Sequence, residues 1–136
     1  METRVQQTTE RHRRGYNCAQ AVACTYCDLF GLDEETAFRL TEGYGLGMGN
    51  MEGTCGALSA ACLLAGMKNS SGNLEQPNSK GSTYKLCRAM MDAFKAQNGS
   101  VICRELKGVD TGTVLRSCGD CITDAAKLLE EVLFEK

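Results

Sequence analysis

Tryptophan is absent from this 136-residue chain, and proline and histidine each occur only once, as Pro77 and His12. A single histidine excludes a two-histidine metal site within one chain, and a catalytic cysteine-histidine pair would have to recruit His12 from a polar, basic segment. We interpret His12 as a solvated surface side chain. With so little proline, helices can run long, and glycine is left as the main residue that ends them.

The chain also lacks a strong charge of either sign and a long apolar run. Fifteen lysines and arginines stand against 17 aspartates and glutamates, so the formal net charge is -2, and like charges form no long block. We therefore expect no nucleic-acid partner. The longest mostly apolar stretch, Cys55 to Met67, is too short to span a bilayer core of about 30 Å, so direct membrane insertion is not expected.

Cysteine, in contrast, is abundant, with nine in the chain. The N-terminal residues are polar and show no apolar core of a signal peptide, so the expected location is the cytoplasm, which is reducing. In that compartment an odd number of thiols at this density indicates metal binding, redox chemistry or core packing rather than a secreted disulfide scaffold.

The spacing of apolar residues predicts an all-α fold, a single compact bundle-like domain of five or six helices over residues 1–136. Asn17 is the expected N-cap of a helix over 18–30, and Asp33 is the expected N-cap of a helix over 34–42. Further helices are predicted over 55–67 with Thr54 as N-cap, over 82–97, and at the C-terminus.

Two other segments carry predictions about exposure and irregular structure. The last helix should turn one face to solvent, formed by Asp124, Lys127, Glu130 and Glu131. Residues 43–53, called here the glycine-rich segment, contain five glycines, which disfavour any regular element and let backbones approach closely. Its spacing does not match a nucleotide-binding loop, but its N-H groups are suited to hydrogen-bond the sulfur atoms of a cluster.

Two Cys-x-x-Cys pairs occur, and their spacing can bring two thiolates to one metal ion or one disulfide. Cys24 and Cys27 lie inside an expected helix beside its apolar stripe, so we interpret both as core packing. Cys118 and Cys121 lie near a helix start, where free N-H groups and the helix dipole lower the pKa of a thiol. We expect chemistry from Cys118 and leave open whether Cys121 takes part or only begins the core stripe.

Cys55 is the most informative single cysteine. It follows the glycine-rich segment, lies in the first turn of a buried helix, and precedes Gly56 and Ala57, which leave its sulfur unobstructed. This position suits a reactive thiolate or a metal ligand, although the same small residues also permit tight helix packing. Cys62 and Cys87 lie within apolar helical stripes and are interpreted as core packing.

Four blocks of sequence, taken together, resemble one known family. They are Tyr16-Asn17-Cys18-Ala19-Gln20-Ala21-Val22, Gly53-Thr54-Cys55-Gly56-Ala57-Leu58-Ser59-Ala60, Cys103-Arg104-Glu105-Leu106, and Cys118 before Asp124-Ala125. Their order and spacing resemble the redox-active proteins named for the cysteine pattern C_GCAxxG_C_C. The likeness is not literal, because the Gly-Cys-Ala of that label appears as Cys55-Gly56-Ala57 and its last glycine is Ala60.

The resemblance implies a helical, cytoplasmic redox protein whose four signature cysteines are Cys18, Cys55, Cys103 and Cys118. Four thiolates are a complete ligand set for an iron-sulfur cluster or a zinc ion, and they can equally form two disulfides. The family also looks related to a domain of split-Soret cytochromes, in which an iron-sulfur centre accompanies haem. As partners we expect a redox protein or a membrane transporter, and a homodimer is the assembly to test.

The signature cysteines support three hypotheses about function. In the first, all four hold an iron-sulfur cluster or another redox metal centre for electron transfer. In the second, a low-pKa Cys55 or Cys118 is the catalytic thiol that attacks, and another signature cysteine resolves the disulfide without a metal. In the third, the four hold a structural zinc ion in a binding module. The sequence leaves open which hypothesis holds and whether the chain is an enzyme.

Overall fold

The computed structural model describes residues 1–134 as an all-α fold. Six helices of eight or more residues are joined by shorter helical turns, and the only extended pairing in the described part is one isolated bridge between Thr54 and Ile102. The predicted fold class and number of longer helices are therefore confirmed. None of the helices in residues 1–134 combines the length and the apolar character that crossing a membrane requires.

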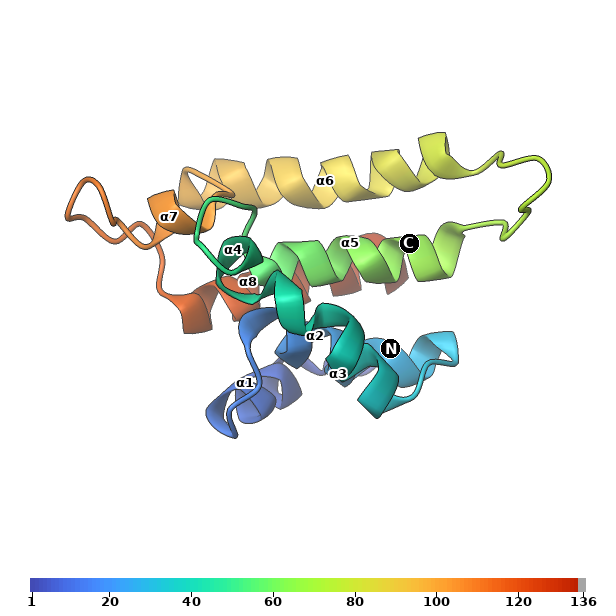
Figure 1. The fold of residues 1–136 in the computed structure, drawn as a ribbon, viewed down its shortest axis with the longest axis horizontal. Helices are drawn as coiled ribbons and strands as arrows, with labels where there is room; N and C mark the ends of the chain where they lie inside the picture. Colours follow the sequence, from blue (N-terminus) through green and yellow to red (C-terminus); the bar gives the residue numbers. More distant parts are fainter. Residues whose placement is uncertain (135–136) are drawn as a thin grey trace.

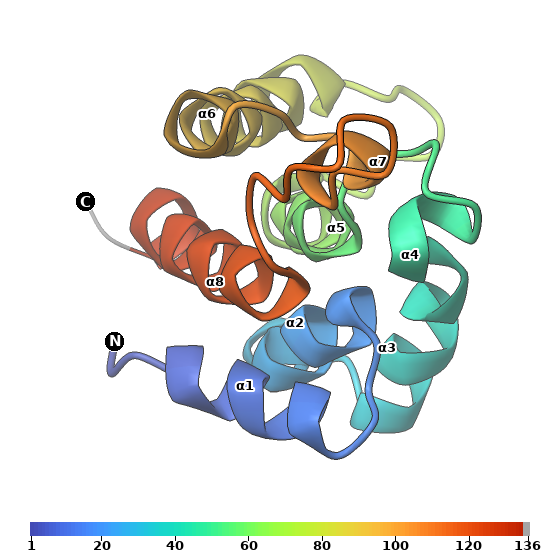
Figure 2. The same cartoon turned by 90° about the vertical axis from the view of Figure 1, so that its left-hand side faces the viewer.

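Helix α5 (Gly56–Asn69) lies at the centre of the molecule. It packs against α2 (Cys18–Tyr26) on one side and α6 (Lys80–Asn98) on the other, and α8 (Cys118–Phe134) contacts all three (Figures 1 and 2). Its buried side chains are alanines and leucines with one glycine, and the small ones let neighbouring helices approach closely. The core is therefore built around the helix that Cys55 precedes.

Two shorter helices cover α2. Helix α1 (Val5–Arg13) packs against α2 and α8, and α3 (Glu34–Thr41) packs against α2. Both predicted N-caps of this region are confirmed: the Asn17 side chain accepts a hydrogen bond from the backbone N-H of Gln20, and the Asp33 side chain accepts one from Thr36. The α-helical part of the predicted helix over 18–30 ends at Tyr26 and continues as the 3-10 turn η1 (Cys27–Phe30).

The predicted N-cap of α5 is wrong. The structure places Cys55, not Thr54, at the N-cap, and no side chain caps this helix. The reason lies in tertiary contacts, because the Thr54 backbone is paired with Ile102 and the Cys55 N-H donates to the carbonyl oxygen of Val101 at 2.7 Å. The helix therefore begins one residue later than the local sequence signal indicates.

The glycine-rich segment is also more regular than predicted. It contains most of the 3-10 turn η2 (Glu42–Tyr44) and the single turn α4 (Gly45–Met48). Within α4, Leu46 and Gly47 have left-handed backbone conformations, with φ of 56° and 54°. Such a conformation strains a leucine, so the surrounding contacts must hold this turn in place.

The predicted solvent face of α8 is wrong at two of its four positions, because Asp124 and Glu130 are buried. Asp124 forms an ion pair with Arg116 at 2.9 Å, and Glu130 accepts hydrogen bonds from the Tyr26 hydroxyl and, at 2.8 Å, from the Arg4 N-H. Partners outside α8 compensate the cost of burying these carboxylates, and the periodicity of the helix cannot reveal such partners.

Candidate cysteine redox site

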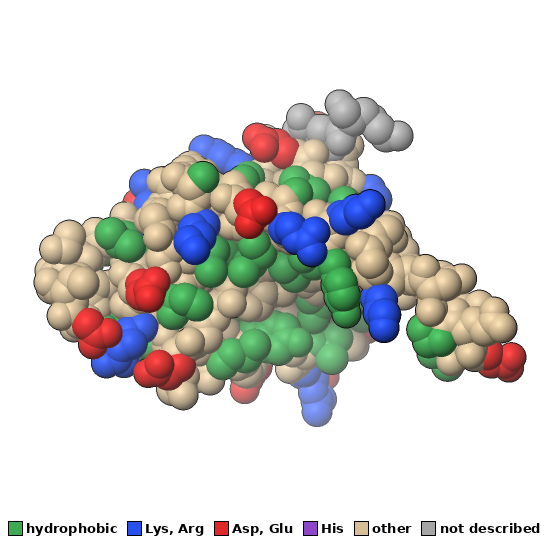
Figure 3. All heavy atoms as spheres, turned by 90° about the horizontal axis from the view of Figure 1, so that it is seen from above, with side chains coloured by type: hydrophobic (Ala, Val, Ile, Leu, Met, Phe, Trp, Pro, Cys, Tyr) green, Lys and Arg blue, Asp and Glu red, His purple; other side chains and the backbone are tan. Residues whose placement is uncertain are grey.

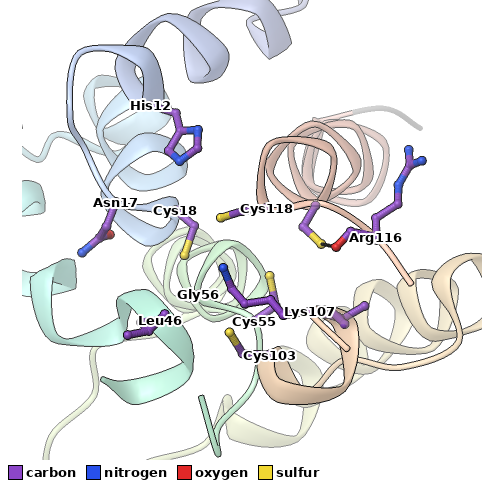
Figure 4. Close-up of a pocket in the computed structure, with 12 residues that line it drawn as sticks. His12, Asn17, Cys18, Leu46, Cys55, Gly56, Cys103, Lys107, Arg116 and Cys118 are labelled. Atoms are coloured by element: carbon purple, nitrogen blue, oxygen red, sulfur yellow. Dashed lines mark hydrogen bonds between the residues drawn. The ribbon is translucent and has the colours of Figure 1, made fainter. Parts of the chain in front are cut away.

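Five cysteines from separate parts of the chain line one pocket of about 180 Å³. They are the four signature cysteines, Cys18, Cys55, Cys103 and Cys118, together with Cys121. Figure 4 shows the Cys18 and Cys118 sulfurs facing each other on one side of the pocket, with Cys55 and Cys103 on the other. The structure thus brings the four signature cysteines together in one pocket. It also places Cys121, whose role the sequence left open, in the same pocket.

Each signature cysteine lies at the start of a helix. Cys18 and Cys118 are the first residues of α2 and α8, Cys103 begins the single turn α7 (Cys103–Leu106), and Cys55 is the N-cap of α5. Helix starts carry unpaired N-H groups and the positive end of the helix dipole, and both stabilise a thiolate. Four helix starts therefore converge on one pocket and favour negative charge on sulfur there.

Backbone hydrogen bonds hold Cys55 next to Cys103. The Cys55 N-H donates to the carbonyl oxygen of Val101, and the Cys103 N-H donates to that of Gly53 at 3.0 Å. The bridge between Thr54 and Ile102 lies between these two contacts. The chain entering α5 and the chain entering α7 thus run side by side, which fixes two signature cysteines relative to each other.

Two glycines are needed because cysteine atoms approach the backbone closely. A Cβ atom added at Gly56 would lie 2.5 Å from the Cys18 sulfur, and one added at Gly47 would lie 2.5 Å from the Cys103 Cβ. Both distances are far shorter than non-bonded carbon contacts allow. The backbone N-H groups of Gly56 and Leu46 also hydrogen-bond to the Cys18 sulfur. The glycine-rich segment therefore contacts sulfur directly, as the sequence indicated.

Cys18 and Cys118 form a hydrogen-bonded pair. The Cys118 thiol is the main cause that lowers the pKa of Cys18, which falls to about 6 despite the opposing effect of burial, with further help from backbone N-H groups. The same hydrogen bond, together with burial, raises the pKa of Cys118. At neutral pH the pair therefore consists of a Cys18 thiolate and a Cys118 thiol.

Cys55 and Cys121 form a second pair of the same kind. The contact with the Cys121 thiol lowers the pKa of Cys55 against the effect of burial, and the same contact raises the pKa of Cys121. The Cys121 thiol also donates to the carbonyl oxygen of Arg116 at 3.9 Å, the dashed line in Figure 4. Of the two thiols expected to have a low pKa, the pKa of Cys55 is lowered and that of Cys118 is raised, because Cys118 is the proton donor of its pair. One signal in the sequence could have placed Cys121 in the pocket: it lies three residues after Cys118, and residues three apart share a helix face.

Cys103 is the unpaired thiol of the pocket, and burial raises its pKa while the positive charge of Lys107 partly offsets this effect. The Lys107 ammonium group points into the pocket in Figure 4. His12 also lines the pocket and is half-buried, a position that its interpretation as a surface side chain did not include. No local sequence signal marked either residue, because each reaches the pocket only through the packing of α1 and α7.

The Cys24-x-x-Cys27 pair lies outside this pocket. Both side chains are buried in the hydrophobic core, as predicted, and burial raises the pKa of both, that of Cys24 to about 12. Cys62 and Cys87 differ from the prediction, because both are only half-buried and contact the core from its edge.

The thiols of the pocket are arranged in pairs, not around one point. Within residues 1–134, no three histidine, cysteine, aspartate or glutamate side chains form a group that could hold a metal ion. A closed zinc site needs four sulfurs at about 2.3 Å from one centre, and the structural zinc hypothesis stays a prediction. The donor set itself, four cysteine thiols in an apolar pocket, has the chemistry of an iron-sulfur site.

The fold and the pocket together define an all-α protein with a buried group of redox-capable thiols. The family model described as "Putative redox-active protein (C_GCAxxG_C_C)" matches residues 16–132, and the chain belongs to this family. The matched range includes every cysteine of the pocket, and the resemblance seen in the sequence is confirmed. Neither the curated proteins nor the solved structures contain a significant match to the chain.

Proposed function

We propose that this chain is a thiol-disulfide redox protein in which Cys18 and Cys118 are the reacting pair. The observation that carries the proposal is their hydrogen bond at two converging helix starts, which gives one thiolate and one thiol side by side. A dithiol that forms a disulfide needs this combination: one sulfur that attacks and a second that can reach it.

The reaction with a disulfide substrate balances without a cofactor. The Cys18 thiolate attacks one substrate sulfur, the substrate S-S bond breaks, and the departing thiolate takes up a proton. Cys118 then loses its proton and attacks the Cys18 sulfur, which releases the second substrate thiol and leaves a Cys18-Cys118 disulfide. Two electrons and the Cys118 proton leave the protein, and the solvent supplies the second proton that the two substrate thiols need. The reverse sequence oxidises a dithiol.

Cys55 and Cys121 are placed to act as a second dithiol in the same pocket. Their contact repeats the relation between Cys18 and Cys118, with Cys55 as the thiol whose pKa is lowered. Two such pairs let the pocket exchange up to four electrons, two for each disulfide formed. Cys103 remains as a fifth thiol beside them.

The test uses the Cys118→Ser variant of the full chain, reduced and then treated with oxidised glutathione. Without its resolving partner, Cys18 should accumulate a mixed disulfide with glutathione, and the wild-type chain should instead form the Cys18-Cys118 disulfide. Cys24→Ala, which removes a buried thiol outside the pocket, is the control and should behave as wild type. Peptide mapping that finds glutathione on other cysteines and none on Cys18 would overturn the proposal.

The iron-sulfur hypothesis is the second candidate, with Cys18, Cys55, Cys103 and Cys118 as ligands. It is favoured by the four helix starts and by the N-H groups of Leu46 and Gly56 on the Cys18 sulfur, because such hydrogen bonds tune a cluster. A cluster on the signature cysteines should survive Cys121→Ala and be lost in Cys103→Ala. The thiol-disulfide proposal expects the opposite result. Cys121→Ala should abolish the Cys55-Cys121 disulfide, and Cys103→Ala should leave both proposed disulfides intact, because Cys103 belongs to neither pair.

The partner that fits this proposal is a redox protein that returns the oxidised pocket to its dithiol state. A membrane transporter as partner, a homodimer and a cytoplasmic location stay predictions of the sequence. Co-purification under anaerobic conditions with the Cys118→Ser variant tests for the redox-protein partner, because that variant should hold it as a mixed disulfide through Cys18.

A further inference from the structure

Cys62 and Cys87 form a third pair of neighbouring thiols, on a different face of the molecule. Cys62 belongs to α5 and Cys87 to α6, and the Cys87 sulfur lies 4.0 Å from the Cys62 carbonyl oxygen. Burial raises the pKa of Cys62, and the neighbouring Cys87 thiol raises it further. Neither residue belongs to the family signature or lines the pocket of the five cysteines.

Both thiols line a shallow groove of about 530 Å³, together with apolar side chains that include Leu63 and Met91. Each thiol is only half-buried, so small molecules in solution can reach them. Figure 3, which looks onto α6, shows hydrophobic side chains gathered on the surface of this part of the molecule. The pair is thus accessible to a small reagent and is held across two packed helices.

We propose that Cys62 and Cys87 are a second redox site, which forms a reversible disulfide between α5 and α6 when a low-molecular-weight disulfide such as oxidised glutathione is present. The two cysteines lie on helices that pack against each other, and the Cys87 sulfur already contacts the backbone of Cys62, so the bond would join neighbouring turns of α5 and α6. This site is independent of the thiol-disulfide reaction proposed for the pocket.

The two thiols have different roles in this reaction. Burial raises the pKa of Cys62 to about 12, so Cys87 is the thiol that attacks. Its thiolate forms a mixed disulfide with one half of the oxidised glutathione, and the other half leaves as a thiolate and takes up a proton. Cys62 then loses its proton and attacks the Cys87 sulfur, which releases the second glutathione. The protein loses two electrons and two protons in total.

The disulfide would fasten the central helix to α6 and close the chain segment between them. That segment includes the extended connection of residues 70–79, which projects from the end of the molecule in Figure 1. A cross-link of this kind restricts the unfolded chain and so favours the folded state. Oxidation at Cys62 and Cys87 should therefore raise the thermal midpoint of unfolding while leaving the pocket unchanged.

The experiment treats the full-length chain with oxidised glutathione and maps disulfides in a non-reducing digest with two proteases, so that Cys55 and Cys62 fall in different peptides. A Cys62-Cys87 link is expected in the wild-type chain, together with a higher thermal midpoint. In Cys62→Ala, Cys87 should keep a mixed disulfide with glutathione, and the midpoint should rise less than in the wild-type chain, because only the pocket disulfide can form. Cys27→Ala, a buried cysteine outside the groove, should form the link as the wild type does.

Two results would overturn this inference: a Cys87 that stays free in excess oxidised glutathione, or a Cys87 linked to a cysteine other than Cys62. The same digest reports on the Cys18-Cys118 disulfide separately. Failure of the groove site and failure of the pocket proposal can therefore be told apart in one sample.

Discussion

The Cys118 thiol donates a hydrogen bond to the Cys18 sulfur, although the two residues lie at opposite ends of the chain. Each is the first residue of its helix, α8 and α2 respectively. The contact therefore joins two helix starts whose dipoles both favour negative charge on sulfur. The packing of α8 against α2 therefore brings the Cys118 thiol to Cys18 and so lowers the pKa of Cys18.

Alkylation of Cys18 by iodoacetamide should follow a pKa of about 6. Only the thiolate reacts, so the rate should rise with pH through this value and level off near neutrality. The rate of an ordinary cysteine still rises at neutral pH and levels off only above its pKa of about 8.5. Cys118→Ala removes the largest cause of the low pKa and should move the midpoint upward. Peptide-resolved alkylation rates between pH 4 and 10 give the measurement, and Cys27→Ala is the control.

A wild-type midpoint near that of an ordinary cysteine would contradict this relationship. So would a Cys118→Ala variant whose Cys18 midpoint does not move, because the hydrogen bond would then have no part in the low pKa.

Two glycines of α5 should respond oppositely to substitution by alanine. At Gly56 the added methyl group would meet the Cys18 sulfur, whereas at Gly66 nothing lies within 4 Å. Gly56→Ala should therefore cost about 1–3 kcal/mol of unfolding free energy through overpacking. Gly66→Ala should gain about 0.5–1 kcal/mol, because alanine favours a helix interior more than glycine does. Urea unfolding of both variants under reducing conditions makes the comparison; equal effects would show that Cys18 does not lie against Gly56.

Substituting Asn17 tests how the helix cap positions Cys18. Asn17→Ala removes the cap of α2, and Asp33→Ala removes the cap of α3, so each should lower the free energy of unfolding by about 1 kcal/mol. Only Asn17→Ala should also alter the alkylation profile of Cys18, since the Asn17 side chain additionally donates to the Glu42 carbonyl oxygen beside the pocket. A Cys18 profile that shifts equally in both variants would indicate general loosening of the fold.

Lys107 should make the pocket prefer anionic reagents. Its ammonium group points toward the thiols and lowers the pKa of Cys103 against the larger effect of burial. The measurement is the ratio of alkylation rates with iodoacetate, an anion, and iodoacetamide, which is neutral. The ratio should fall severalfold in Lys107→Met and be retained in Lys107→Arg. An unchanged ratio in Lys107→Met would show that its charge does not act in the pocket.

Local signals in the sequence predicted what depends on local interactions. Helix class, the caps at Asn17 and Asp33, and the burial of Cys24 and Cys27 follow from periodicity, capping chemistry and apolar neighbours. The meeting of the four signature cysteines was indicated by resemblance to the family, and each proves to lie at a helix start.

The remaining features depend on contacts between distant segments. Burial of Asp124 and Glu130 requires Arg116 and Tyr26, which no local pattern connects to them. The same is true of the position of His12 in the pocket. The sequence also could not predict which thiols pair with each other. Four cysteines allow three connectivities, and the structure adds Cys121 as a fifth.

The most direct measurement is an anaerobic redox titration of the full-length chain, with disulfide mapping and iron and sulfide analysis at each potential. The result expected is a two-electron couple in which the Cys18-Cys118 disulfide appears as the free thiols disappear. The contradicting result is stoichiometric iron and sulfide bound to the reduced chain, with Cys18 and Cys118 never joined by a disulfide at any potential.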